Sequence, residues 1–528
     1  MRDLIVAVDI GTGSARAGVF DRRGTLLARA DHPIAMRRSR ENHAEHDSED
    51  IWRAVCHCVR AALAEAGEDR SRVAALGFDA TCSLVVRDRD GAPLAVSGAG
   101  GETRWDTVVW LDHRALAEAD FCTRSGHPVL DHSGKVMSPE MEMPKLMWLK
   151  RRCPEQWQKA GYFFDLADFM TWKATGSLSR SRCTITAKWN YLAHETQGWR
   201  ADFLKLIGLE DLQERGALPD ETLPVGAAVG RLTPAAAAAL GLDTECLVGT
   251  GLIDAYAGTL GVVGAFASDP EAMERQLALI GGTSSCIVAF SREKKFGFGM
   301  WGPYYEAVLP GWWLVEGGQS ATGALLDHLV RTHSAGGEPV SATHMRIASR
   351  IRELQAEEGA AFAERMHVLP DFHGNRSPLA DPHALGVISG LSLDPSFDGL
   401  CRLYWRTCVA IALGIRHILD KLGECGYALD TLHVTGGHVK NPLLMELYRD
   451  VTGCRVVVPK TNDAVLLGTA MVAAVAGGIY DDLASAGSGM YPGGDEFLPD
   501  ADRKPSYDRD YRRFLALYRH RAELDAIL

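Results

Sequence analysis

Residues 4–20 read LIVAVDIGTGSARAGVF, and the order of residue types in this stretch decides the fold. A compact apolar run at 4–9 ends in the carboxylate of Asp9, four small or polar residues follow, and a second apolar run occupies 17–20. Apolar runs on either side of a glycine cluster predict two strands joined by a tight turn. A dinucleotide-binding fold needs a helix after its glycines. The chain continues here as a strand, so that fold is not expected.

The residues after this hairpin alternate between strand and helix patterns. DRRG at 21–24 is a turn signal, and another apolar run follows it. Apolar residues then recur at the spacing of one helix face. The first hundred residues therefore predict an α/β domain. Its expected elements are strands at 25–30, 73–78 and 84–87 and a helix at 49–66.

A second stretch, residues 277–290, repeats the first. It reads LALIGGTSSCIVAF, which is again a strand, a Gly/Thr/Ser turn and a strand. A single repeat of this kind predicts two related domains rather than a solenoid. We place their junction at 255–265, where glycines suggest a crossing between an N-terminal domain (1–260) and a C-terminal domain (261–528). The second domain is expected to hold helices at 400–423, 442–450 and 467–477, strands at 432–435 and 455–459, and a docking helix at 507–518.

Composition limits the classes of function. The chain has 528 residues, of which 46% are hydrophobic and 23% charged, as in soluble globular proteins. Its net charge is −12 and it has no Lys/Arg-rich run, which argues against a nucleic-acid partner. No apolar stretch reaches the ~20 residues of a membrane span, and no signal peptide is expected. The twelve cysteines form no CxxC pair, so a reducing, cytoplasmic location is predicted.

Both glycine turns suit phosphate binding. Small residues let backbone N–H groups approach phosphate oxygens, and the Thr and Ser hydroxyls add donors. A carboxylate at the end of the first strand, Asp9, can hold a hydrated magnesium ion. Either loop alone could be a plain hairpin turn. Two such loops on facing domains can grip one polyphosphate.

Two further segments place polar groups beside apolar runs. Asp254 lies in GLIDAYAG at 251–258, where it could act as the general base toward a hydroxyl group. It could also cap a helix that starts at 255, and the two roles are compatible. LHVTGGH at 432–438 either offers a flat surface to a base or ribose or forms a tight strand-to-helix connection.

Six segments in this order resemble the FGGY family of carbohydrate kinases, in the actin-like ATPase superfamily, nearly from end to end. The resemblance implies an α/β fold of two actin-like (ribonuclease H-like) ATPase domains facing a central cleft. The first domain would bind mainly the sugar, and the second mainly ATP with Mg²⁺. The segments are DIGTGSARAGVFD at 9–21, MPKLMWL at 143–149, GLIDAYAG at 251–258, IGGTSS at 280–285, GVISGL at 386–391, and GGHVKNPLL at 436–444 with the Ala-rich helix after Asp463.

The resemblance also implies roles for single residues. Asp254 would be the catalytic base, and Asp9 would hold Mg²⁺ through water. The ATP contacts would be Thr12, Gly13, Ser14, Arg16, Gly282, Thr283, Gly323, Gly437 and Asn441. The sugar contacts would be Thr81, Cys82, Ser83, Asp112, Lys188, Asp254 and Glu316.

Within this family the chain is similar to the pentulose kinases. GFDATCS at 77–83, WLDHR at 110–114, Lys188 and Glu316 look like the sugar-side positions of ribulokinases, and the Arg-Glu pair of glycerol kinases is missing. This similarity implies phosphorylation of D-ribulose to D-ribulose 5-phosphate, with L-ribulose, xylulose or a polyol as alternatives. An actin-like ATPase without a sugar substrate is the non-kinase alternative. A homodimer is expected from the family.

Histidines raise two further questions. His438 stands where many relatives have a small residue, so it is expected to reshape the adenosine pocket. RRSRENHAEH at 37–46 carries His43 and His46. No third or fourth ligand is near them in sequence, so a solvated loop is predicted there rather than a metal site.

Overall fold

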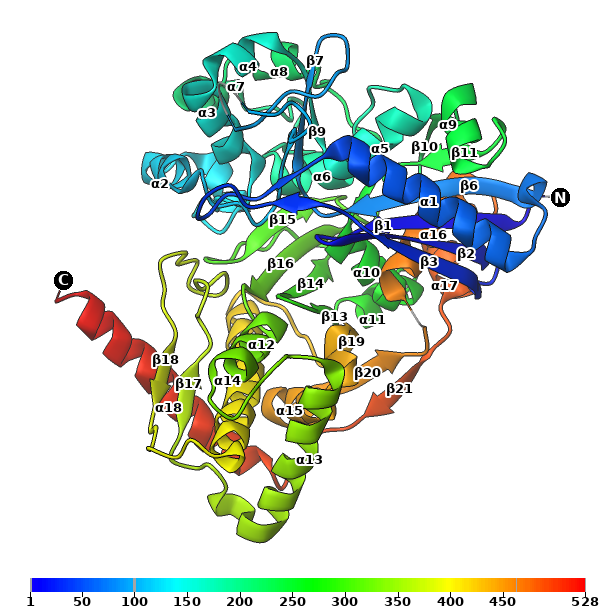
Figure 1. The fold of residues 1–528 in the computed structure, drawn as a ribbon. Helices are drawn as coiled ribbons and strands as arrows, with labels where there is room; N and C mark the ends of the chain where they lie inside the picture. Colours follow the sequence, from blue (N-terminus) through cyan, green and yellow to red (C-terminus); the bar gives the residue numbers. More distant parts are fainter. Residues whose placement is uncertain (1, 98–100, 462, 528) are drawn as a thin grey trace.

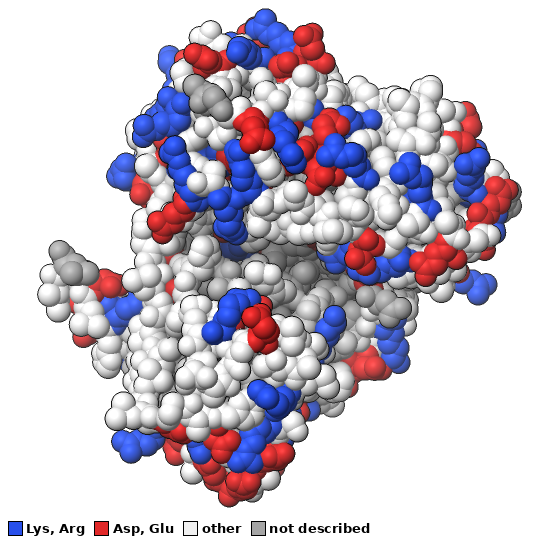
Figure 2. Space-filling view, in the orientation of Figure 1, with Lys and Arg blue, Asp and Glu red and all other residues white. Residues whose placement is uncertain are grey.

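The computed structural model describes residues 2–97, 101–461 and 463–527. It has two lobes, each built on a seven-stranded mixed sheet, and the surface is hollowed between them (Figures 1 and 2). The N-terminal half forms the upper lobe in Figure 1, and most of the C-terminal half forms the lower lobe. The predicted α/β class with two facing lobes is confirmed.

The sheet of the upper lobe begins from the hairpin that opens the chain. Its strand order is β10-β11-β6-β1-β2-β3, and β12 also pairs with β6. β1 runs antiparallel to β2 and parallel to β6, and all its residues are buried. The strands are β1 Leu4–Ile10, β2 Ser14–Asp21, β3 Leu26–Pro33, β6 Val73–Ala80, β10 Ala228–Arg231, β11 Leu247–Gly249 and β12 Leu252–Ile253.

The sheet of the lower lobe repeats this pairing. Its order is β15-β16-β14-β13-β19-β20-β21, and β13 runs antiparallel to β14 and parallel to β19. The repeat read from the sequence is thus a shared sheet topology. The strands are β13 Gln276–Gly281, β14 Ser285–Ser291, β15 Trp301–Tyr305, β16 Trp313–Gln319, β19 Thr431–Gly436, β20 Arg455–Pro459 and β21 Gly494–Phe497.

Helices cover both sheets. In the upper lobe α1 spans Ser48–Ala66, and Asp47 caps it by accepting from the amides of its first turn. In the lower lobe the predicted C-terminal docking helix is α18, whose aromatic side chains are buried in the core with α14 and α15. These lower-lobe helices, with two more that precede them in the chain, are α12 Gly323–Thr332, α13 Ser341–Glu358, α14 Phe397–Glu424, α15 Pro442–Thr452 and α18 Lys504–Asp525.

Segments at 36–46, 84–97 and 101–223 add an accessory layer to the upper lobe, centred on the sheet β4-β5-β8-β7-β9. The solvated loop predicted at 37–46 was wrong in part, because β4 and β5 lie at its ends and His46 is fully buried. The strands are β4 Met36–Arg37, β5 Glu45–His46, β7 Leu84–Asp88, β8 Thr107–Val108 and β9 Ala160–Asp165. The helices are α2 Leu116–Ser125, α3 Glu142–Arg152, α4 Pro154–Lys159, α5 Leu166–Thr175, α6 Arg182–Lys188, α7 Ala201–Leu206 and α8 Leu212–Gly216.

Two helices fill the space between the sheets, α10 (Asp254–Val263) and α16 (Ala464–Ala476). The glycine-rich crossing predicted at 255–265 is therefore a helix. Its glycines serve close packing: a Cβ on Gly261 would lie 2.0 Å from a carbonyl oxygen of α16, and a Cβ on Gly468 would lie 1.9 Å from one of α10. The two backbones approach this closely only because neither glycine has a side chain.

The division at residue 260 separates the two sheets but not all of the helices. α16 follows β20 in sequence, yet it packs on β1 and β6 of the upper lobe (Figure 1). Thr469 Oγ1 donates to Asp79 of β6, and a Cβ on Gly77 would lie 2.8 Å from the Thr469 carbonyl oxygen. The apolar Ala-rich sequence of α16 suits a helix that is buried on several sides.

Within the described residues, every helix is too short or too polar to serve as a membrane span. All twelve cysteines are free thiols.

Candidate active site

The first phosphate loop is the turn between β1 and β2. Trp110 Nε1 donates to Thr12 Oγ1 over 3.0 Å, and His46 Nε2 donates to the Thr12 carbonyl oxygen over 3.0 Å. Burial lowers the pKa of His46 to about 4, so its ring is neutral at pH 7. On the other side of the turn, a Cβ on Gly13 would meet no described atom within 4 Å. The loop is thus held at Thr12 by Trp110 and His46, while space is open at Gly13.

Arg16, next to this loop, interacts with the charges of four carboxylates from separate segments. They are Asp9, Asp79, Asp254 and Asp463. Asp9 and Asp79 are paired neighbours on β1 and β6. Arg16 Nη2 lies 2.7 Å from Asp9 Oδ2, and Arg16 Nη1 lies 4.0 Å from Asp463 Oδ2. Burial raises the pKa of Asp9 to about 7 against the charge of Arg16, and the charges of Asp463 and Asp254 add to the rise.

The Asp9 carboxylate suits a hydrated cation. It is fully buried, and neither oxygen accepts a hydrogen bond from the described residues. Arg16 supplies a positive charge at Oδ2, and the waters around Mg²⁺ would supply the hydrogen-bond donors that the carboxylate lacks. In the described part of the chain no group of three or more His, Cys, Asp or Glu is arranged to hold a metal. Contact through water is compatible with both observations.

Asp254 is the first residue of α10, and Ile253 takes the N-cap position. The Asp254 carboxylate accepts from the next amide, Ala255 N, over 2.7 Å, and the residue is partly exposed. Burial raises the pKa of Asp254, while the charges of Arg16 and Lys188 oppose that rise. Asp254 is therefore close enough to both Arg16 and Lys188 to interact with their charges.

Lys188 and Glu316, both predicted sugar contacts, meet across the two lobes. Lys188 Nζ, at the end of α6, lies 3.2 Å from Glu316 Oε2 on β16. Tyr256 donates its hydroxyl to the same carboxylate oxygen over 2.7 Å, and Lys188 Nζ lies 4.2 Å from the ring centre of Trp301. The Tyr304 hydroxyl nearby is buried without a hydrogen-bond partner among the described residues. This cluster offers donors, acceptors and an aromatic face to a polyhydroxy ligand.

The other predicted sugar contacts divide into two groups. Thr81 and Ser83 follow β6, with their hydroxyls 3.2 Å apart, and the charge of Lys188 reaches the buried thiol of Cys82. Asp112 is engaged elsewhere. Its oxygens accept from the Ala44 amide and from three nitrogens of Arg114. The carboxylate of Asp112 is thus engaged within the upper lobe, and its neighbour His113 lines a cavity.

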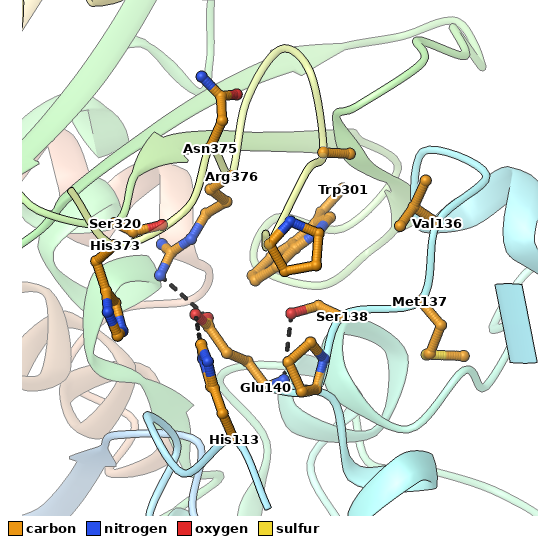
Figure 3. Close-up of a pocket in the computed structure, with 13 residues that line it drawn as sticks. His113, Val136, Met137, Ser138, Glu140, Trp301, Ser320, His373, Asn375 and Arg376 are labelled. Atoms are coloured by element: carbon orange, nitrogen blue, oxygen red, sulfur yellow. Dashed lines mark hydrogen bonds and ion pairs between the residues drawn. The ribbon is translucent and has the colours of Figure 1, made fainter. Parts of the chain in front are cut away.

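That cavity, of about 40 Å³, is lined by an ion pair between the lobes (Figure 3). Arg376 Nη2 donates to Glu140 Oε2 over 3.0 Å, and His113 Nε2 lies 3.6 Å from Glu140 Oε1. His113 stacks on His373 with ring centres 5.2 Å apart. Burial alone would raise the pKa of Glu140, but Arg376 and His113 outweigh it and lower the pKa to about 2. Glu140 and His113 come from the upper lobe, and Arg376 and His373 from the lower lobe.

Sequence reasoning did not single out Glu140, Arg376 or His373 as site residues. The stretch DFHGNRSP at 371–378 contains two of them, but nothing local shows that it reaches the opposite lobe. The signature residue Lys145 has an indirect role. Its buried ammonium donates to the Glu140 carbonyl oxygen over 3.0 Å and so fixes the backbone from which Glu140 projects.

The second phosphate loop, at 282–284 between β13 and β14, opens into a larger pocket. Its cavity is about 760 Å³ and lies between the loop, α12, α13 and the start of α15. Met345 of α13 is 67% exposed on this wall, which gives the pocket an apolar face. All five predicted ATP contacts of the lower lobe line this one pocket: Gly282, Thr283, Gly323, Gly437 and Asn441.

Comparison with known proteins identifies the family. Residues 4–261 match the N-terminal domain and residues 277–477 match the C-terminal domain of the FGGY family of carbohydrate kinases. The chain belongs to this family. This carbohydrate kinase is 42% identical to the human FGGY carbohydrate kinase domain-containing protein, over 99% of the chain and 97% of that protein.

Two further relatives of this FGGY kinase bear on its fold and class. It is 36% identical to a D-ribulokinase of Saccharomyces cerevisiae, over 90% of the chain and 72% of that protein. A xylulose kinase from Rhodospirillum rubrum has the same fold, with a TM-score of 0.80 and 24% identity over 99% of both chains. Family membership sets aside the alternative of an actin-like ATPase without a sugar substrate.

Proposed function

We propose that this kinase transfers the γ-phosphoryl group of ATP to a hydroxyl of a pentulose, with D-ribulose as the substrate and D-ribulose 5-phosphate as the product. One observation carries the proposal. Asp254 begins α10 two residues before Tyr256, which donates to Glu316, and its carboxyl group interacts with the charges of both Arg16 and Lys188. A phosphoryl donor on one side and a hydroxyl acceptor on the other would meet at this carboxylate.

The residues divide the chemistry among them. Asp254 takes the proton of the attacking hydroxyl, the oxygen forms a bond to the γ-phosphorus, and the bond to the β-phosphate oxygen breaks to release ADP. The backbone amides and hydroxyls of the two loops hold the phosphates in line. The pair Lys188–Glu316, with Tyr256, orients the sugar by hydrogen bonds to its hydroxyls.

Asp9 would hold Mg²⁺ through water, since its buried oxygens lack hydrogen-bond donors. The ion supplies charge neutralisation on the phosphate oxygens. Arg16 lies beside Asp9 and keeps this region from being purely acidic.

Closure of the lobes would exclude water from the transfer. The Glu140–Arg376 pair joins them beside Trp301, and the adjoining cavity of about 40 Å³ leaves little room beyond the sugar-side cluster. A closed site of this kind favours transfer to the bound sugar over hydrolysis of ATP.

D-ribulose is preferred over L-ribulose, xylulose and polyols because a D-ribulokinase is among the curated relatives at 36% identity. The test is ADP release from purified protein with D-ribulose, L-ribulose, D-xylulose, L-xylulose and ribitol. We expect the highest kcat/KM on D-ribulose. A higher kcat/KM on any other member of the panel would overturn the substrate but keep the kinase. A homodimer and a cytoplasmic location stay predictions, and gel filtration tests the first.

A further inference from the structure

The imidazole of His438 is buried behind the second phosphate loop. His438 lies just after β19 and is 4% exposed. Its Nε2 is 3.2 Å from both the Gly282 carbonyl oxygen and the Thr322 hydroxyl, and its Nδ1 is 2.9 Å from the Tyr448 hydroxyl. A Cβ on Gly281 would lie 2.3 Å from the ring, so the loop rests directly on it. The residue lines the nucleotide pocket but directs its ring nitrogens inward.

The partners of the ring select one protonation state. A carbonyl oxygen only accepts, and the Thr322 hydroxyl accepts from Ser285 and donates to the same carbonyl oxygen over 3.4 Å, so Nε2 carries the hydrogen and donates it to Gly282. Nδ1 is then the acceptor for the buried Tyr448 hydroxyl. Burial lowers the pKa of His438 to about 4, which keeps the ring neutral at pH 7. Tyr448 thereby holds the tautomer that directs a donor at the loop.

This hydrogen bond orients the next amide of the loop. The peptide group between Gly282 and Thr283 is planar and trans, so its carbonyl oxygen and its N–H point in opposite directions. His438 holds the oxygen from the interior, together with the Gly323 amide at 3.1 Å and the Thr322 hydroxyl at 3.4 Å. The Thr283 N–H must then point away from the ring. It has no hydrogen-bond partner among the described residues, and Thr283 is exposed at the pocket.

We propose that His438 is a positioning residue for the phosphates of the bound nucleotide, acting through the Gly282–Thr283 peptide group. The inference rests on the proposed function, since it takes ATP as the occupant of this pocket. It also revises the expectation that His438 reshapes the adenosine pocket. Its effect falls on the phosphate end of the site.

The test measures dissociation constants of adenosine, ADP and ATP for the full-length protein by titration calorimetry. His438→Leu removes both ring nitrogens at similar volume, and we expect about tenfold weaker binding of ADP and ATP, in line with one lost hydrogen bond to a buried group. Adenosine, which lacks phosphates, should bind as it does to the wild type. His438→Gln keeps an N–H near the Nε2 position and should restore most of the ATP affinity.

Tyr448→Phe keeps the aromatic ring and removes only the hydroxyl that fixes the tautomer of His438. It should weaken ATP binding without weakening adenosine binding, and by a smaller factor than His438→Leu. His344→Asn is the matched control. His344 lines the same pocket, bonds to Tyr404 and makes no bond to the loop, so any loss should be equal for adenosine and ATP.

Two results overturn the inference. In the first, His438→Leu and Tyr448→Phe bind ATP as tightly as the wild type does. In the second, these variants lose affinity for adenosine and for ATP by the same factor. A wild-type protein that binds no ATP refutes the proposed function, and the inference with it. Wild-type ATP binding together with unchanged variants refutes the inference alone.

Discussion

The ammonium of Lys188 and the carboxylate of Glu316 lie 3.2 Å apart, although the two residues are 128 positions apart in the sequence and belong to different lobes. Both side chains are almost fully buried, and Tyr256 donates to the same carboxylate. The polar groups that would form hydrogen bonds to the sugar therefore come from both lobes. This arrangement makes sugar binding depend on how the lobes are placed relative to each other.

Replacing Lys188 by Met should impair sugar binding more than ATP binding. The change removes a charged donor at the sugar-side cluster, and a hydrogen bond to a charged group contributes roughly 1.5–3 kcal/mol. We expect KM for D-ribulose to rise about tenfold to a hundredfold, with KM for ATP within about twofold of the wild type. Initial-rate kinetics in both substrates measure the split.

Lys173→Met is the matched control for this experiment. Lys173 also pairs with a glutamate, Glu49, but this partly exposed pair lies within the upper lobe alone. Its kinetics should equal those of the wild type. If Lys188→Met raised KM for ATP and not for the sugar, the assignment of Lys188 would be wrong.

Breaking the Glu140–Arg376 pair should loosen the closed cleft. In Glu140→Gln the pair between the lobes loses its charge, so water should enter the site more often. We expect faster ADP release in the absence of sugar and a higher KM for D-ribulose. The comparison variant is Glu358→Gln, because Glu358 pairs with Arg402 within the lower lobe alone. An unchanged ratio of ATP hydrolysis to sugar phosphorylation in Glu140→Gln would count against this role.

Acid should inactivate the enzyme through Asp254. Burial raises the pKa of this carboxyl above its ordinary value, and a base must be deprotonated to accept a proton. The rate should therefore fall as the pH decreases through the raised pKa, by about tenfold per pH unit below it. Glu140, with a pKa of about 2, stays ionised over the same range. Asp9, whose pKa is raised to about 7, titrates there as well, so the profile is recorded at saturating Mg²⁺, which favours its ionised form. The pH profile of kcat/KM for the sugar measures this, and a flat profile down to the ordinary aspartate pKa would contradict it.

Replacing Asp9 by Asn should raise the Mg²⁺ requirement. Asp9 is expected to hold the ion through water. Hydrogen bonds to the groups that coordinate a metal contribute about tenfold or more to metal affinity. The concentration of Mg²⁺ at half-maximal rate should rise by that factor, and excess Mg²⁺ should restore much of the rate. A variant that responds to Mg²⁺ as the wild type does would place the ion elsewhere.

Local patterns predicted the fold well, and five positions predicted from motifs to contact ATP line one pocket. The strands on both sides of each glycine loop, and the helices at 49–66 and 400–423, appear as β1, β2, β13, β14, α1 and α14. Each of these depends on periodicity and turn residues that neighbours in sequence display. The five lower-lobe ATP positions meet in one pocket because the shared sheet topology brings their loops together.

Long-range contacts account for what the sequence did not reveal. Glu140 and Arg376 pair over 236 positions, and neither has a local pattern that points to the other. Asp112 was predicted to contact the sugar because it lies in a motif, whereas the buried Arg114 two residues later engages its carboxylate. α16 was predicted as a helix, but its placement on the opposite sheet depends on Gly77, Gly261 and Gly468 meeting carbonyl oxygens of another segment.

The central claim is that Asp254 accepts the proton of the attacking hydroxyl. The most direct test is the single-turnover rate constant for D-ribulose phosphorylation by Asp254→Asn at saturating ATP and Mg²⁺. We predict a fall of about 10²- to 10⁴-fold, the usual contribution of a general base, with the dissociation constant of ATP close to the wild-type value. A rate constant within about threefold of the wild type would contradict the account, since a positioned base contributes far more than that.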